Sequence, residues 1–213
     1  MLTIHHLGKS QSERIIWLCE ELGLPYDLEI YTRDAKTILA PPALKALHPI
    51  GAAPLLRDGD VFLAESGAIM DYILARYGNG RLVPRPDSPE FPHYLYWFHY
   101  ANGTLQAAIG RLMILNRLSL PGDNPVLQAI QGRMERALAL VETRLGEADF
   151  FAGHEFTAAD IIMVFSLTTM RLFQPIDLGP YPNVRAYLAR IGQREAYRRA
   201  MQKGDPGLTP LLT

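Results

Sequence analysis

Residues 51–69 read Gly-Ala-Ala-Pro-Leu-Leu-Arg-Asp-Gly-Asp-Val-Phe-Leu-Ala-Glu-Ser-Gly-Ala-Ile. Two short apolar runs, 53–56 and 61–64, flank an Asp-Gly pair, which is a strong signal for a β-hairpin. Apolar residues then recur at helical spacing until Gly78, which suits the end of a helix. The segment therefore predicts two antiparallel strands followed by a helix over 66–77.

The residues before this hairpin alternate between the two hydrophobic periods. Residues 2–7 form a short β-prone run, and apolar side chains then recur at helical spacing until Gly23. Residues 26–30 alternate again, which predicts a second strand, parallel to the first because a helix intervenes. Residues 32–52 are polar and contain several prolines, so we expect an irregular segment with one short helix. The predicted order is βαβ(α)ββα.

Four prolines within residues 81–92 interrupt both helical and strand patterns. We interpret this stretch as a linker. Helices are predicted after it at 92–118, 124–146, 157–173 and 182–200, and the third is apolar on every side, as expected of the buried centre of a bundle. The predicted fold is an α/β domain over 1–80, a linker over 81–92, and an all-helical domain over 93–213.

Composition narrows the classes of function. The chain has 213 residues, 48% hydrophobic and 20% charged, with a formal charge of −1. That balance predicts a folded protein without the basic field that most nucleic-acid binders use. Its one cysteine, Cys19, excludes a disulfide framework, a CxxC pair and a cysteine-based zinc cluster, and its place on an apolar helical stripe predicts a buried structural role. We expect no metal and no membrane partner, and a cytoplasmic protein, since neither a leader nor an 18-residue apolar run is present.

Pro54 stands at the start of an apolar strand, where it cannot donate to the ladder. A cis bond there would leave the main chain of Ala53 free to pair with an extended, peptide-like ligand. Only about 5–6% of X-Pro bonds in folded proteins are cis. The local sequence therefore favours an ordinary trans proline on an edge strand.

Glu65 and Ser66 stand at a helix start directly after a strand. Serine is a preferred N-cap, and the local pattern favours that interpretation. The alternative is an anion site, in which the helix N-terminus and the Ser66 hydroxyl bind a carboxylate while Glu65 binds an ammonium. Such a pair would suit an α-amino-acid head group.

The turn between the first strand and helix is Gly8-Lys9-Ser10-Gln11-Ser12-Glu13-Arg14. Ser10 and Ser12 are both possible caps. A hydroxyl and a lysine at a helix N-terminus would also stabilise a thiolate, because cations and helix N-termini lower a thiol pKa. A two-unit decrease in pKa needs about 2.7 kcal/mol of preferential interaction.

Together these features resemble the cytosolic glutathione transferases, over nearly the whole chain. The resemblance rests on residues 10–14, on His48-Pro49-Ile50-Gly51-Ala52-Ala53-Pro54-Leu55, on residues 65–69, and on Thr157-Ala158-Ala159-Asp160, a capping box before an apolar run with Phe156 at the staple position. The aromatic run 96–103 is similar to fungal and bacterial members.

The resemblance implies a thioredoxin-like N-terminal domain that binds glutathione as co-substrate and a helical domain that completes a pocket for the electrophile. Ala53, before a cis Pro54, would pair with the cysteinyl backbone of glutathione. Glu65 and Ser66 would hold its γ-glutamyl end. Ser10 would be the thiolate donor, with Ser12 or a backbone N–H as the alternative.

The chain departs from the family pattern at Ala52, where many members carry a basic residue for the glycyl carboxylate. Lys9, His48 or Lys36 could replace that anchor. No tyrosine occupies the first turn. The electrophile pocket is predicted to include Tyr96, Tyr100 and Arg111.

The leading hypothesis is a transferase with a role in detoxification. It would conjugate glutathione to small hydrophobic electrophiles, with peroxidase activity as a side reaction, and act as a homodimer. The alternative is a non-catalytic member of the fold that binds glutathione or a protein partner. A disulfide-exchanging enzyme is disfavoured because the first turn has no cysteine.

Overall fold

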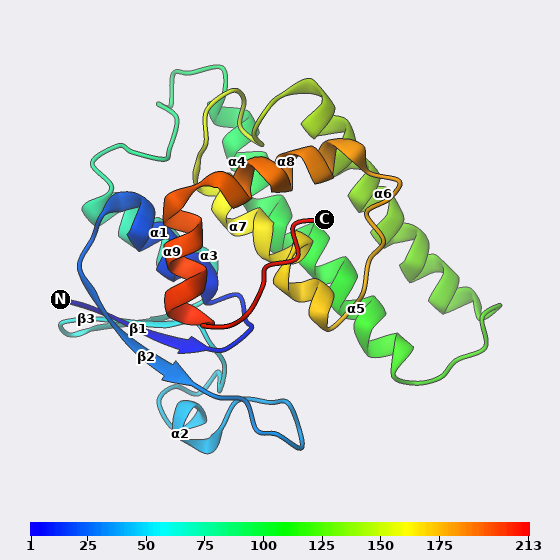
Figure 1. The fold of residues 1–213 in the computed structure, drawn as a ribbon, viewed down its shortest axis with the longest axis horizontal. Helices are drawn as coiled ribbons and strands as arrows, with labels where there is room; N and C mark the ends of the chain where they lie inside the picture. Colours follow the sequence, from blue (N-terminus) through cyan, green and yellow to red (C-terminus); the bar gives the residue numbers. More distant parts are fainter. The chain divides into compact units, whose positions relative to one another are not determined.

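The computed structural model describes residues 1–213, which form two compact units. One unit contains Met1–Leu82 and Gly192–Pro210, and the other contains Val83–Ile191 and Leu211–Thr213 (Figure 1). The sequence had predicted one helical domain over 93–213. The structure differs in grouping the segment Gly192–Pro210, from near the C-terminus, with the N-terminal unit.

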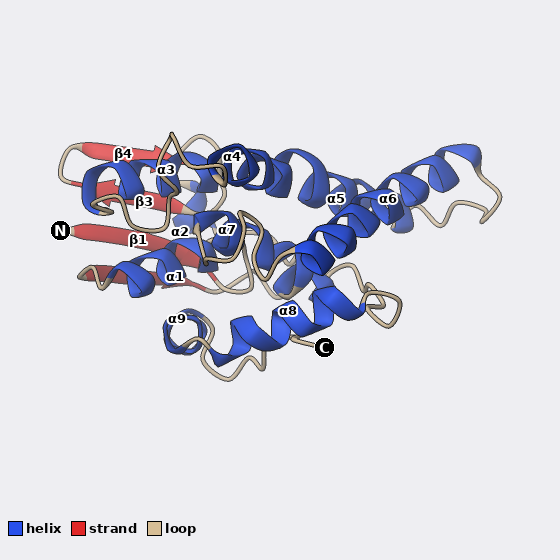
Figure 2. Cartoon of the chain, turned by 90° about the horizontal axis from the view of Figure 1, so that it is seen from above, coloured by secondary structure: helices blue, strands red, loops and turns tan.

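The first unit is a four-stranded mixed sheet with helices. Its elements are β1 (Leu2–Leu7), α1 (Glu13–Leu22), β2 (Tyr26–Tyr31), α2 (Pro42–Lys45), β3 (Leu55–Asp58), β4 (Val61–Ala64), α3 (Ser66–Tyr77) and α9 (Glu195–Gly204). The strand order is β2-β1-β3-β4, with β1 and β2 parallel and the other pairs antiparallel; Figure 2 shows the strands side by side. The predicted βαβαββα order and the parallel first pair are confirmed.

Alternation along β1 sends its two histidines to opposite faces of the sheet. Leu7 packs on one face with Leu44 of α2, and His5 points to that side, where its ring lies 5.9 Å from the rings of Tyr31 and Phe62. His6 points to the other face, which α1 and α9 cover. Consecutive histidines therefore have different surroundings.

Helix α9 packs directly on α1 within the first unit. The rings of Trp17 and Tyr197 lie 4.8 Å apart, and both side chains are buried. Arg194, just before α9, pairs with Glu21 at 2.7 Å. Residues 182–200 were predicted as one helix, but the chain is extended at Arg194, so α9 takes its own direction. This packing carries the segment that follows α9 to the carboxyl end of β1.

The second unit is helical, as predicted. Its elements are α4 (Phe91–Tyr100), a π-helical turn (Ala101–Gln106), α5 (Ala107–Asn116), α6 (Pro125–Glu147), α7 (Ala158–Leu167), a 3₁₀ turn (Thr169–Leu172) and α8 (Pro182–Gln193). The π turn interrupts the helix predicted over 92–118, and α7 ends earlier than expected. Neither unit contains a helix of the length and apolar character needed to cross a membrane.

Helix α7 is buried along its whole length, and a capping box defines its start. The Thr157 N–H donates to the Asp160 carboxylate at 2.8 Å. That carboxylate also accepts from the N–H of Phe151 and the hydroxyl of Tyr187. Burial raises the pKa of Asp160 to about 6, although these hydrogen bonds oppose the increase. The predicted capping box is confirmed.

Candidate functional site

The first turn places two serine hydroxyls against each other at the end of β1. Ser12 is the N-cap residue of α1, but its side chain makes no cap hydrogen bond. Its hydroxyl accepts instead from the N–H of Leu7 at 3.2 Å and lies 2.7 Å from the Ser10 hydroxyl. Ser12 is fully buried, whereas Ser10 is 7% exposed. Of the two serines, Ser10 is therefore the one with access to a ligand.

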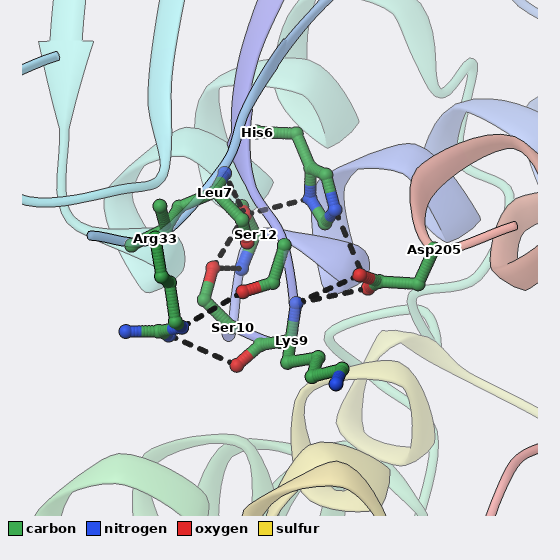
Figure 3. A network of polar contacts seen from close by, with 8 residues as sticks. His6, Leu7, Lys9, Ser10, Ser12, Arg33 and Asp205 are labelled. Carbon is green, nitrogen blue, oxygen red and sulfur yellow. Dashed lines mark hydrogen bonds and ion pairs between the residues drawn. The ribbon is translucent and has the colours of Figure 1, made fainter. Parts of the chain in front are cut away.

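Behind Ser12 lies a second layer of polar groups. The Ser12 hydroxyl is 2.8 Å from Nδ1 of His6, and Nε2 of the same ring lies 3.4 Å from the Asp205 carboxylate. Asp205 also accepts from the N–H of Lys9 at 2.8 Å. Figure 3 shows the resulting chain of contacts from Asp205 through His6 and Ser12 to Ser10.

Arg33, in the loop after β2, donates hydrogen bonds to the main chain of the turn between β1 and α1. Its guanidinium donates to the carbonyl of Gly8 at 2.9 Å and to that of Lys9 at 3.0 Å (Figure 3). It also donates to the carbonyl of Ile38. Burial lowers the pKa of Arg33, and the negative charge of Asp205 opposes that decrease. Lys9 has a φ of 54°, in the left-handed region that non-glycine residues rarely adopt. The turn is thus fixed by side chains from two distant segments.

The bond between Ala53 and Pro54 is cis. The local sequence had favoured a trans proline, and that interpretation is wrong here; the cis form implied by the family resemblance is the one present. Ala53 precedes the β3 ladder, which begins at Leu55, and its main-chain groups make no loop or turn hydrogen bond within the protein. Because β1 and β3 are antiparallel, this free main chain lies beside the end of β1 and the first turn.

Ser66 is the first residue of α3 and not its cap. Glu65 occupies the N-cap position with a φ of 70° and makes no side-chain cap bond. Ser66 is buried, and its hydroxyl accepts from Arg14 of α1 at 3.1 Å; the same guanidinium donates to Gln11 in the first turn at 3.0 Å. Burial lowers the pKa of Arg14 to about 9, which leaves it charged at neutral pH. Arg14 therefore joins the first turn to the start of α3.

Glu65 adopts a strained backbone and presents an exposed carboxylate. Residues in such conformations cluster at ligand sites, where the surrounding structure maintains them. The N–H groups at the start of α3 favour an anion in the same place. Opposite charges of a ligand's amino-acid group would find matching partners here.

Two of the candidate replacements for a basic anchor differ in their surroundings. Nδ1 of His48 accepts from the N–H of Ile50 at 3.2 Å, and its ring packs on Phe62, so this histidine organises its own turn. Lys9 is exposed, and its ammonium makes no ion pair. Lys9 is the better placed of the two to meet a carboxylate near the first turn.

Comparisons with known proteins agree over both units. The family described as "Glutathione S-transferase, N-terminal domain" matches residues 6–81, and "Glutathione S-transferase, C-terminal domain" matches residues 124–190. Glutathione S-transferase 3 of Schizosaccharomyces pombe is 30% identical over 226 residues, covering 100% of this chain and 92% of the relative. The chain belongs to the glutathione S-transferase family.

Two further relatives support this membership. GstB of Escherichia coli, a glutathione S-transferase, is 29% identical over 211 residues, covering 94% of this chain and 98% of the relative. The crystal structure of a glutathione S-transferase from Actinobacillus pleuropneumoniae is 34% identical, with a TM-score of 0.89, covering 98% of this chain and 94% of that one. The similarity therefore extends over both units of this glutathione S-transferase.

The helical unit of this glutathione S-transferase has an open groove of about 770 Å³ between α4 and α6. Tyr96 and Tyr100, both predicted for the electrophile pocket, line it together with Arg133 and Arg136. The Tyr100 hydroxyl donates to the carbonyl of Ala137 at 3.1 Å, and burial raises the pKa of Tyr100 to about 12. The predicted Arg111 lies on α5, exposed and outside this lining.

Four residues of the first turn's surroundings were not singled out from the sequence as site residues: His6, Arg14, Arg33 and Asp205. His6 and Arg14 stood next to or within the quoted motif, but serine spacing alone does not show which side chains a hydroxyl meets. Asp205 follows α9, 196 positions from Lys9. No local pattern connects these two residues, and only the packing of α9 on α1 brings them together.

Proposed function

We propose that this glutathione S-transferase family member conjugates the thiolate of glutathione to small hydrophobic electrophiles, with reduction of peroxides as a side reaction. One observation carries the proposal: the Ser10 hydroxyl, the free main chain before cis-Pro54 and the buried Ser66 belong to adjoining segments at one edge of the sheet. Each of these three segments presents a polar group that could bind one part of a short acidic peptide.

In the proposed complex the main chain of Ala53 pairs with the cysteinyl backbone of glutathione. Ser66 and the N-terminus of α3 receive the γ-glutamyl carboxylate, and Glu65 receives the ammonium. Lys9 is our first candidate for the glycyl carboxylate, because Ala52 offers no charge; His48 and Lys36 are the others. These contacts would hold the sulfur close to Ser10.

Ionisation of the thiol is the chemical contribution that we assign to the first turn. A hydroxyl donor together with a helix N-terminus can supply the roughly 2.7 kcal/mol that a two-unit decrease in thiol pKa requires. Proximity to a bound electrophile supplies the rest of the acceleration. Tyr96 and Tyr100 are the proposed contacts of the electrophile, and Arg111, which lies outside the lining that they share, is not among them.

A specific contact keeps the non-catalytic alternative open. The Ser10 and Ser12 hydroxyls are 2.7 Å apart, so one of them must donate to the other. If Ser10 is that donor, its hydrogen is not directed at a ligand. A protein in this state would bind glutathione or a protein partner without activating a thiol.

Calorimetric titration with reduced glutathione, followed by a conjugation assay with an activated aryl halide on the same preparation, tests both functions. Binding with turnover supports the transferase, and binding without turnover supports the alternative. Ser10→Ala should raise the apparent pKa of the bound thiol, followed by thiolate absorbance. If Ser12→Ala does so and Ser10→Ala does not, the donor is Ser12.

We also propose a cytoplasmic homodimer with a role in detoxification. The homodimer is proposed from the family to which the chain belongs, in which dimers are usual. Equilibrium sedimentation should give twice the mass of the chain. A monomeric mass at micromolar concentration contradicts this part of the proposal.

A further inference from the structure

His6 is enclosed between a hydroxyl and a carboxylate from opposite ends of the chain. Its Nδ1 lies 2.8 Å from the Ser12 hydroxyl and its Nε2 lies 3.4 Å from the Asp205 carboxylate. The ring is fully buried, and Asp205 is 8% exposed at its side chain. Gly204 lies directly against the ring, because a Cβ there would be 3.2 Å from Nε2. The end of α9 is closely fitted around this histidine.

The hydrogens of this network can be counted for a neutral ring. Nε2 of His6 makes no hydrogen bond, but the negative charge of Asp205 at 3.4 Å favours a hydrogen on Nε2 and leaves Nδ1 as an acceptor. Ser12 then donates to Nδ1 and accepts from Ser10, because the Leu7 carbonyl at 3.5 Å is too distant to compete. In this state the only hydrogen of the Ser10 hydroxyl points inward to Ser12.

The direction of the hydrogen bonds reverses when His6 carries a hydrogen on both nitrogens. Nδ1 then donates to Ser12, whose second lone pair already accepts from the N–H of Leu7. The hydroxyl hydrogen of Ser12 must therefore go to Ser10, 2.7 Å away. Ser10 is left with its own hydrogen free to point outward, where it can donate to a thiolate.

We propose that His6 and Asp205 are positioning residues that set the direction in which the Ser10 hydroxyl donates. Asp205 favours the doubly protonated ring by placing a negative charge against Nε2, and the imidazolium orients Ser12 and then Ser10 outward. The inference rests on the proposed function for the part that concerns the thiolate. The hydrogen-bond order within the protein stands independently of any ligand.

Asp205 is the charged group that lies against the His6 ring. Asp205 forms the one ion pair of His6. Its negative charge also acts on the Arg33 guanidinium, where it opposes the decrease in pKa that burial causes. The other charged side chains on the elements around this ring are Glu13, Arg14, Glu20 and Glu21 of α1, Asp27 and Glu29 of β2, Arg57 and Asp58 of β3, and Glu195, Arg198, Arg199 and Lys203 of α9. Of these, Arg199 and Lys203 pair with Glu20. Asp205 is therefore the group whose removal should change the protonation of His6.

The first test needs no ligand. Nitrogen-15 NMR of the histidine rings in the full-length protein reports which ring nitrogens carry hydrogen. We expect hydrogen on both nitrogens of His6 in the unaltered protein, and we expect Asp205→Asn to leave Nδ1 without one. A ring that holds hydrogen only on Nε2 at every pH where the protein is folded overturns the proposal.

The second test joins the network to the thiol. In Asp205→Asn the apparent pKa of bound glutathione should rise by about one unit, the effect of weakening one charge-assisted donor. The fall in kcat/KM at high pH should also begin at lower pH than in the unaltered protein. Asp205→Glu should restore part of both. Asp87→Asn, which removes an exposed carboxylate paired with Arg85, is the matched control and should change neither.

Two comparisons separate this inference from simpler explanations. If Asp205 acts through Ser10, the effects of Asp205→Asn and Ser10→Ala on the thiol pKa should not add; full additivity contradicts the proposed connection. Failure of the unaltered protein to bind glutathione would contradict the proposed function and leave the NMR result to decide the hydrogen-bond order. A purely structural role for Asp205 would lower stability without moving the pH profile.

Discussion

Arg14 donates to Ser66 at 3.1 Å across 52 positions of sequence, inside the N-terminal unit. Through its second contact, to Gln11, the same guanidinium connects the start of α3 to the first turn. Both ends of the proposed peptide site therefore depend on one buried cation. The two motif segments, in the first turn and at the start of α3, are thus joined by hydrogen bonds through Arg14.

Ser66→Ala should weaken glutathione binding and leave the fold intact. The substitution removes a hydroxyl donor at the helix N-terminus and one acceptor for the Arg14 guanidinium. We expect a loss of about 1–2 kcal/mol in binding, about five- to thirtyfold in Kd, typical of a hydrogen bond to a charged group. Calorimetric titration measures the change, with Ser88→Ala, in the second unit, as control. An unchanged Kd would remove Ser66 from the site.

Thr157→Ala should reduce the free energy of unfolding by about 1 kcal/mol, because it removes the hydroxyl of the capping box at α7. Urea denaturation followed by circular dichroism measures this difference. Glutathione binding should be unchanged at concentrations where both proteins are folded. A loss below the error of the measurement would show that the Asp160 half of the box is sufficient.

Asp160 should give the stability a specific dependence on pH. Its pKa is raised from 3.8 to about 6, so the native state binds this proton more tightly than the unfolded chain does. The contribution is fully favourable below about pH 4 and is lost as pH rises through about 6, with a total of about 3 kcal/mol. Other carboxylates act in the opposite direction. The relevant measurement is therefore the difference in unfolding free energy between the unaltered protein and Asp160→Asn from pH 4 to 7.

The difference in unfolding free energy between the unaltered protein and Asp160→Asn should change with pH only between about pH 4 and 7. It should be constant above pH 7. Asparagine keeps an oxygen that can accept from the Thr157 N–H, so the variant retains part of the cap. Parallel curves for the two proteins across the whole range would show that Asp160 does not take up the proton. A slope of the opposite sign would mean that hydrogen bonding outweighs burial at this carboxyl.

Cys19 should be unreactive in the native protein. It is fully buried on α1, and burial together with Glu20 raises its thiol pKa to about 12. Because the thiolate is the reactive form, labelling should be roughly a thousandfold slower than for an unperturbed thiol. A chromogenic disulfide reagent measures the rate with and without urea. Rapid labelling of folded protein would contradict the structural role that the sequence predicts.

Much of this fold could be predicted because its signals are local. The Asp-Gly pair at 58–59, the alternation over 26–30 and the Thr157–Asp160 box each specify a hairpin, a strand or a helix start through neighbouring residues. The break between α8 and α9 was missed, because residues 182–200 keep a helical pattern through Arg194. Packing of Tyr197 against Trp17 favours the new direction, and no pattern within α9 shows its partner.

By itself the sequence determined the order of elements, the family resemblance and the identity of the serines, because propensity, periodicity and turn chemistry act over a few residues. The tertiary structure alone decided the surroundings of those serines. In the folded protein the Ser12 hydroxyl contacts Nδ1 of His6, and Asp205 lies against the other nitrogen of the same imidazole ring. Ser10 is left as the more accessible of the two serine hydroxyls. The direction of a hydroxyl depends on which donors and acceptors enclose it, and these come from segments that meet only when the chain is folded.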